Sequence, residues 1–321
     1  DLRMKAKNFA FVVGLFMLLI MSACQRAEVK ERICSKDNAF AVTDKALYRS
    51  IGVTCQIESW LIAGDEIVIT STNPDSLFYS YSCNDFRKLA VYGRKGHGHN
   101  EFVSPLMFTG KSGNLLAIDN ATMKVYKSDK GRFEQTETSR LHDALNDLKT
   151  ISYPLVAYNS IAPLEVCLKI VNIESGQLVD SIAFKDNTGR GNAAVYDYAW
   201  DYNNGKIVIA HIHSEKFVVC NVNENGKILD ITSFDSSGIL SKDKTFYTDV
   251  ACGEYIYLLS QKKVNVNDFS GYSEIEVYDY NGQPVKRIEL DFISPKMLLD
   301  RTNNKLIFAS AIDENIHIID L

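Results

Sequence analysis

The chain has 321 residues, which is longer than one typical domain and allows either two domains or one large repeat or barrel architecture. Its 46% hydrophobic and 23% charged residues exclude a disordered or fibrous protein. A net charge of −5 argues against a dedicated nucleic-acid binder, because such proteins need a cationic surface to neutralise phosphates. We therefore expect a globular protein that binds no nucleic acid.

The first 23 residues have the pattern of a secretory signal peptide. Met4 follows three residues that we interpret as upstream carry-over, and basic residues then precede an apolar run at 9–21. This run is too short for a membrane-spanning helix, which needs about 20 residues. The small residues Ser22 and Ala23 complete the expected cleavage site.

Cys24 comes next, and the stretch 20–24 (IMSAC) resembles the lipobox of bacterial lipoproteins. The resemblance implies that acyl chains on Cys24 hold the protein on a membrane surface. Gln25 then implies sorting to the outer membrane, and the lack of an acidic run after Cys24 favours its periplasmic face. The alternative is an ordinary cleaved signal beside which Cys24 lies by chance. Residues 24–37 are polar and predict a flexible, lipid-anchored leash.

Six cysteines remain after Cys24, and they are spread over more than 200 residues. This spacing favours buried thiols, although an even number of cysteines in an oxidising compartment is also typical of disulfide pairs. The sequence contains no Cys-x-x-Cys pair, which excludes a thioredoxin-like or zinc-ribbon site. We expect no cofactor and no metal.

Residues 38–321 form short alternating or β-branched runs bounded by Gly, Asn and Asp, which predicts an all-β domain. Two sets of runs recur at intervals of roughly 40 to 57 residues, the period typical of propeller blades. The first set comprises 66–70, 115–119, 152–157, 206–211, 255–260 and 305–310, and the second 77–81, 124–127, 166–172, 217–222, 274–280 and 315–319. Only 139–149 predicts a helical turn or two, around three leucines.

Polar turns that close on glycine follow the second run in four units, at Gly131, Gly176, Gly226 and Gly282. Each glycine supplies the positive φ of a tight hairpin, so a third strand follows, as at 227–232 and 285–290. Six units fit, but the sixth stops before an outer strand. We therefore predict a six-bladed β-propeller whose last blade is closed by an N-terminal strand within 38–51. Two β-sandwich domains are disfavoured, because no linker interrupts the repeat near its midpoint.

The stretch 89–102 (LAVYGRKGHGHNEF) carries a glycine-rich motif formed by Gly93, Arg94, Gly96, Gly98, Glu101 and Phe102. It resembles the connection between blades in TolB-like six-bladed β-propeller lipoproteins, except that His99 and Asn100 replace the usual Pro-Gly. The resemblance implies the propeller fold and the lipid anchor. It implies no particular activity, since most members of the family lack an established one.

This loop has two interpretations. Glycine-rich amides with Arg94 and Lys95 could cradle a phosphate, but neither a helix pattern nor a Walker lysine follows. We favour a structural role, in which the glycines let the chain cross to the next blade. In that interpretation Arg94 and Glu101 form an ion pair, and Phe102 packs between blades.

Seven residues are candidate binding residues: Arg94, His97, His99, Tyr198, Trp200, His211 and His213. Each histidine pair is spaced two apart and could chelate a metal, but because no third ligand is apparent we favour histidines that make hydrogen bonds to the protein or to water. The two aromatic residues could stack on a sugar or peptide, or pack between blades.

Five aspartates near predicted strand ends could line one mouth of the channel or cap blade turns: Asp119, Asp197, Asp201, Asp249 and Asp313. No hydrolase or protease motif is present, so we predict no catalytic residue. We expect a binding or scaffold module for a periplasmic protein, peptide or glycan. The alternative is a lyase or hydrolase that acts on a glycan or small molecule in the channel mouth. A deep pocket lined by convergent titratable residues would favour this enzyme.

Overall fold

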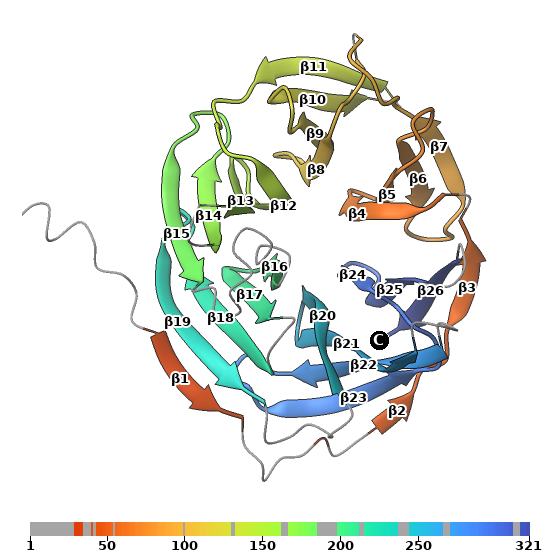
Figure 1. Cartoon of the computed structure of the whole chain (residues 1–321), viewed down its shortest axis with the longest axis vertical. Helices are drawn as coiled ribbons and strands as arrows, with labels where there is room; N and C mark the ends of the chain where they lie inside the picture. Colours follow the sequence, from red (N-terminus) through yellow and green to blue (C-terminus); the bar gives the residue numbers. More distant parts are fainter. Residues whose placement is uncertain are drawn as a thin grey trace, which may run out of the picture.

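The computed structural model describes residues 29–34, 40, 43–53, 55–98, 100–129, 132–161, 166–184, 198–211, 215–236, 244–265, 270–310 and 315–321. Within these ranges the strands form six sheets that surround a central channel as the blades of a propeller (Figure 1). This confirms the predicted all-β, six-bladed fold. None of the described residues belongs to a helix that could cross a membrane.

Each blade is a meander in which the first strand lines the channel and the fourth lies at the rim (Figure 1). The first three blades contain β4 (Ile57–Ala63), β5 (Glu66–Ser71), β6 (Phe78–Ser82) and β7 (Lys88–Tyr92); β8 (Pro105–Thr109), β9 (Leu115–Asp119), β10 (Lys124–Asp129) and β11 (Arg132–Thr138); and β12 (Leu145–Ser152), β13 (Leu155–Ile161), β14 (Val166–Asn172) and β15 (Leu178–Phe184).

The last three blades contain β16 (Tyr198–Asn203), β17 (Lys206–His211), β18 (Lys216–Val222) and β19 (Ile228–Asp235); β20 (Lys244–Cys252), β21 (Ile256–Asn265), β22 (Ser270–Tyr278) and β23 (Pro284–Leu290); and β24 (Lys296–Asp300), β25 (Lys305–Ala309) and β26 (Asn315–Asp320). The two predicted sets of runs therefore fall on the second and third strands of the blades, except that 152–157 begins at the last residue of β12. These strands read as apolar runs because neighbouring blades cover both of their faces, as in β9, where every residue is buried.

The ring closes as the sequence predicts. β3 (Arg49–Gly52) pairs antiparallel with β26 and supplies the outer strand of the sixth blade. Ile51 lies opposite Ile316, and the Ser50 hydroxyl lies 2.9 Å from Nδ1 of His317. The strand begins inside the predicted segment 38–51 and extends one residue beyond it, to Gly52.

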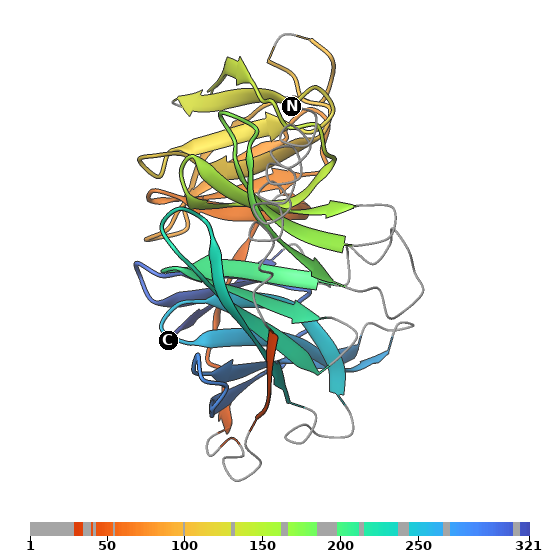
Figure 2. The same cartoon turned by 90° about the vertical axis from the view of Figure 1, so that its left-hand side faces the viewer.

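Two further N-terminal strands extend the outer edges of two blades. β1 (Val29–Ile33) pairs in parallel with β19, and β2 (Thr43–Lys45) pairs in parallel with β23, so the fourth and fifth blades each have five strands. The edge-on view of Figure 2 places β1 on the outside of the ring. Part of the segment expected to act as a flexible leash is thus held against the propeller by backbone pairing.

The predicted helical turn at 139–149 is wrong, because residues from Leu145 onward form strand β12. The pairing of β12 with β13 shifts register between Asn146 and Lys149, and Asp147 has a positive φ of 49°. This bulge buries Leu145 and Leu148, three residues apart, in one cluster with Leu141. A bulged strand therefore imitates the apolar spacing of a helix.

The turn glycines allow neighbouring blades to approach each other closely. Gly176, Gly226 and Gly282 have φ values between 73° and 79°, as predicted, whereas Gly131 lies outside the described residues. Two of them also abut the preceding blade: a Cβ on Gly282 would lie 2.2 Å from the Phe234 ring of β19, and one on Gly226 would lie 3.1 Å from Ile170. The turn needs glycine for its backbone conformation and for close approach of two blades.

The motif at 93–102 has a structural role in this fold. The Glu101 carboxylate lies beneath the loop and accepts the Gly98 N–H at 2.8 Å, and a Cβ on Gly96 would lie 2.1 Å from it. The expected Arg94–Glu101 ion pair is not found among the described residues. Phe102 is fully buried between the first two blades, which confirms its predicted role.

Candidate functional site in the central channel

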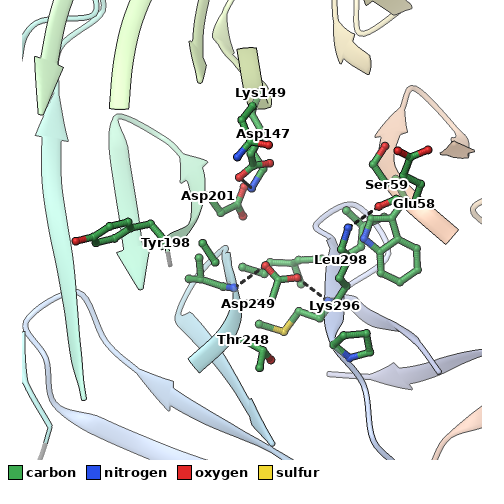
Figure 3. A pocket seen from close by; sticks show the side chains of 18 of the residues that line it. Glu58, Ser59, Asp147, Lys149, Tyr198, Asp201, Thr248, Asp249, Lys296 and Leu298 are labelled. Atoms are coloured by element: carbon green, nitrogen blue, oxygen red, sulfur yellow. Dashed lines mark hydrogen bonds and ion pairs between the residues drawn. The ribbon is translucent and has the colours of Figure 1, made fainter. Parts of the chain in front are cut away.

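A cavity of about 400 Å³ occupies the channel, lined by the first strands of all six blades (Figure 3). A second cavity of about 210 Å³ shares part of this lining. Seven charged side chains line the larger one: Glu58 on β4, Asp147 and Lys149 on β12, Asp201 on β16, Asp249 on β20, Lys296 on β24, and Arg301 just after β24. The channel is therefore a pocket lined by convergent titratable groups, within the usual size range of small-ligand sites.

Lys149 projects into the cavity from the bulged strand. Its ammonium lies 3.5 Å from the Asp147 carboxylate, donates to the Trp200 carbonyl and lies 4.8 Å from the centre of the Trp200 ring. Burial lowers the pKa of this ammonium, but the surrounding carboxylates outweigh that effect and raise the pKa above its ordinary value. Lys149 is therefore a cation at neutral pH.

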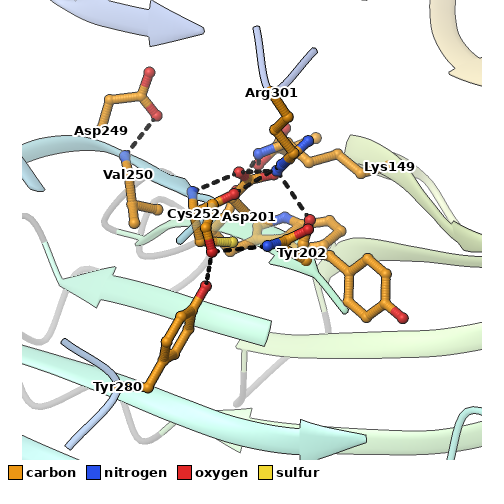
Figure 4. Close-up of polar contacts among 12 residues, drawn as sticks. Lys149, Asp201, Tyr202, Asp249, Val250, Cys252, Tyr280 and Arg301 are labelled. Atoms are coloured by element: carbon orange, nitrogen blue, oxygen red, sulfur yellow. Dashed lines mark hydrogen bonds and ion pairs between the residues drawn. The ribbon is translucent and has the colours of Figure 1, made fainter. Parts of the chain in front are cut away.

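Asp201 and Arg301 join three blades at one edge of the cavity (Figure 4). One carboxylate oxygen of Asp201 accepts the Cys252 N–H at 2.9 Å and an Arg301 N–H at 2.7 Å. Arg301 also donates to the carbonyls of Cys252 and Tyr202, at 2.8 and 3.0 Å. These contacts connect the fourth, fifth and sixth blades, so both side chains serve primarily to hold the ring together.

Asp249 makes a similar connection between the fifth and sixth blades. Its two oxygens accept the N–H groups of Val250 and Met297, at 2.9 and 2.8 Å. Burial raises the pKa of this carboxyl to about 6, while Lys149 and the two N–H groups act in the opposite direction. Asp249 therefore changes charge close to physiological pH.

Lys296 connects the sixth blade to the first. Its ammonium donates to the Glu58 carbonyl across the blade boundary (Figure 3). An ammonium has three donors, so this contact leaves Lys296 able to bind a ligand. The exposed Glu58 side chain lines the same part of the cavity.

The aromatic and histidine candidates on β16 and β17 divide between cavity and core. Tyr198 lines the cavity and packs edge-on against His211, with ring centres 4.6 Å apart. Trp200 is fully buried between the third and fourth blades, so it is a core residue and no stacking platform. His213 lies outside the described residues.

The candidates in the loop at 93–102 do not line the cavity. Arg94 and His97 are exposed in the connection from β7 to β8, and His99 lies outside the described residues. Among the residues that the structure describes, no three metal-ligating side chains come together. Cys24 also lies outside the described residues.

The five aspartates have different roles. Asp119 is buried and accepts the backbone N–H groups of Val103, Ser104 and Ala121, which makes it a turn cap. Asp201 and Asp249 line the channel as described above. Asp197 and Asp313 lie outside the described residues.

The cysteines after Cys24 are thiols, and all but the half-buried Cys167 are buried. Burial raises the pKa of Cys83 to about 12, so this thiol is protonated and unreactive.

No family model and no curated protein matches this chain. Several solved structures resemble it. A member of the DUF4221 family from Bacteroides vulgatus ATCC 8482 has a TM-score of 0.56 at 9% identity, over 88% of this chain and 98% of the other. A Bacteroides fragilis NCTC 9343 protein described as exported has a TM-score of 0.54 at 12% identity, over 88% of both chains. The Cps50 (Swd1) β-propeller domain of Myceliophteria thermophila has a TM-score of 0.54 at 11% identity, over 86% of this chain and all of the other. At these identities the likeness shows the fold alone.

Five of the charged cavity residues were not recognised from the sequence: Glu58, Asp147, Lys149, Lys296 and Arg301. A signal exists, because each first strand directly precedes an apolar run of the first set. The lining residues do not alternate along the strand, because consecutive residues line the cavity at 248–251 of β20 and 296–299 of β24, and register shifts interrupt the pairing of β4, β12 and β20. The side chains that face the channel therefore cannot be selected by a period of two.

Proposed function

We propose that this chain is an exported lipoprotein that acts as a binding or scaffold module, with the channel cavity as its ligand site. The observation that carries the proposal is the cavity itself. Contacts between blades fix several of its charged side chains before any ligand arrives. Such preorganisation reduces the entropy lost on binding and suits recognition of a protein segment, peptide or glycan.

The proposed location follows from the N-terminal sequence. Residues 1–23 are the signal peptide, and lipid on Cys24 holds the propeller at the periplasmic face of the outer membrane. The resemblance to TolB-like lipoproteins supports this assignment, and one propeller of the same fold is a Bacteroides fragilis protein described as exported. Replacing Cys24 with serine tests it: the wild-type protein stays in the membrane fraction, whereas C24S leaves it. Retention of C24S would contradict lipid anchoring.

A lyase or hydrolase in the channel is the second candidate, and Asp249 is the residue that favours it. A carboxyl with a pKa of about 6 in a cavity has the properties of a general acid or base. Its two hydrogen bonds to backbone N–H groups favour a structural role instead. A turnover that disappears in Asp249→Asn while ligand binding persists would establish the enzyme.

The binding function is tested by closing the cavity. Leu106 lines it from β8, and Leu106→Trp fills part of the space, whereas Leu89→Trp adds the same bulk to the outer strand β7. We expect candidate peptides and glycans to raise the melting temperature of wild type and of Leu89→Trp but not of Leu106→Trp. Cross-linking in the native membrane should capture a partner through the same cavity. A thermal shift that survives Leu106→Trp would place the site elsewhere.

A further inference from the structure

Charged groups stand on opposite walls of the channel cavity. In a closed ring of six consecutive blades the third faces the sixth, so β12 lies across the channel from β24. Asp147 and Lys149 project from the first of these strands and Lys296 from the second (Figure 3). Glu58 stands beside Lys296 on the neighbouring blade. Each wall therefore offers an ammonium and a carboxylate.

Asp147 is the cavity carboxylate best placed to meet a ligand. The carboxylates of Asp201 and Asp249 accept backbone N–H groups at 2.8 to 2.9 Å. Asp147 instead contacts Lys149 at 3.5 Å, longer than an ordinary hydrogen bond, and its side chain is 37% exposed. It can accept a hydrogen bond from a ligand without breaking a contact between blades.

The backbone at Asp147 supports this role. A positive φ is unfavourable for any residue with a side chain, and here it coincides with a bulge in the strand. Bulges redirect side chains. This one leaves Leu145 and Leu148 in the core and puts Asp147 in the channel lining.

We infer that the cavity binds a short peptide with free termini, its ammonium at Asp147 and its carboxylate at Lys296. This inference rests on the proposed function. A neutral glycan would desolvate these charges without pairing them, and a phosphate would meet four carboxylates against three cations. Trp60, Leu106 and Leu298 add an apolar part to the lining, which suits small side chains.

Isothermal titration of the mature protein with trialanine tests the inference. Trialanine with free termini should bind, and its N-acetylated and C-amidated forms should bind about 10- to 100-fold more weakly, the range for one lost charged hydrogen bond. Asp147→Asn should weaken the free peptide but not the acetylated one. Lys296→Met should likewise weaken the free peptide but not the amidated one.

Two surface variants serve as controls. Asp85→Asn removes an exposed aspartate that pairs with Arg87 at 3.8 Å, and Lys111→Met removes an exposed lysine outside the cavity. Both should bind trialanine like the wild type, and melting temperatures verify that every variant folds. Trialanine that is both N-acetylated and C-amidated, and the neutral disaccharide cellobiose, serve as uncharged ligands. If either binds as tightly as the free peptide, and Leu106→Trp abolishes that binding, the peptide inference is overturned while the proposed function stands. Absence of saturable trialanine binding also overturns it, and membrane cross-linking then decides the proposed function separately.

Discussion

Replacing Gly282 with alanine tests how the blades are joined. Gly282 has a φ of 79°, and a Cβ there would lie 2.2 Å from Cδ1 of Phe234 on the preceding blade. Gly64 is a matched control, because its φ is 59° but a Cβ would meet nothing within 4 Å. Both substitutions impose backbone strain, and only Gly282→Ala adds an overlap between blades.

The expected magnitudes follow from these two contributions. A left-handed backbone costs a residue with a side chain about 1 to 2 kcal/mol, which is the full expected loss for Gly64→Ala. Overlap in a well-packed interior adds about 1 to 3 kcal/mol, so Gly282→Ala should lose about 2 to 5 kcal/mol.

Urea unfolding, followed by tryptophan fluorescence, measures both losses. We expect a clearly lower midpoint urea concentration for Gly282→Ala than for Gly64→Ala, with similar slopes. Equal losses would show that the contact with Phe234 contributes nothing, and would refute the argument that this turn glycine is required by close approach of two blades.

Three further predictions concern single side chains. Asp201→Ala removes the acceptor of the Cys252 N–H and of Arg301, so unfolding free energy should fall by about 2 to 4 kcal/mol, and less in Asp201→Asn, which keeps one acceptor. Phe102→Ala empties a fully buried site and should cost about 3 to 5 kcal/mol, whereas Leu89→Ala, 42% exposed, should change stability by under about 0.5 kcal/mol. Asp249 has a folded pKa of about 6, above its unfolded value, so the stability it contributes is present below about pH 4 and is lost as the pH rises through 6. Asp249→Asn should flatten this dependence in chemical denaturation between these pH values.

Each of these predictions has a contrary result. Equal losses in both Asp201 variants would mean that the acceptor oxygen is unimportant. A Phe102→Ala protein as stable as Leu89→Ala would contradict burial of the motif phenylalanine between blades. If Asp249→Asn and wild type lose stability in parallel between about pH 4 and 6, another group titrates there.

The fold could be predicted because the second and third strands of each blade are covered on both faces. This environment produces the repeated apolar runs, such as 115–119 and 206–211, which match β9 and β17 residue for residue. The turn glycines then indicated where each third strand ends and a fourth begins. The outer strand missing from the sixth unit indicated closure by an N-terminal strand, which is β3. The failure at 139–149 has a local cause, since a bulge in β12 gives its leucines a spacing of three.

The residues that line the cavity were harder to predict than the fold. Consecutive residues of an inner strand line the cavity, as at 248–251 and 296–299, so no alternation in the sequence marks the lining. Asp201 and Asp249 were recognised as candidate channel residues because they lie beside the repeating apolar runs. Trp200 was a candidate for stacking on a ligand, but it is a core residue. The sequence cannot distinguish an aromatic residue that packs between blades from one that faces the cavity.

Methyl NMR spectroscopy tests most directly whether the channel is the binding site. Leu106 and Leu298 line the cavity, whereas Leu89 and Leu178 are exposed on the outer strands β7 and β15. Titration with trialanine and with cellobiose should shift the methyl resonances of the first pair with at least one of the two probes, and leave the second pair unchanged. Saturable shifts at the outer leucines, with the cavity leucines unmoved, would contradict a ligand site in the channel.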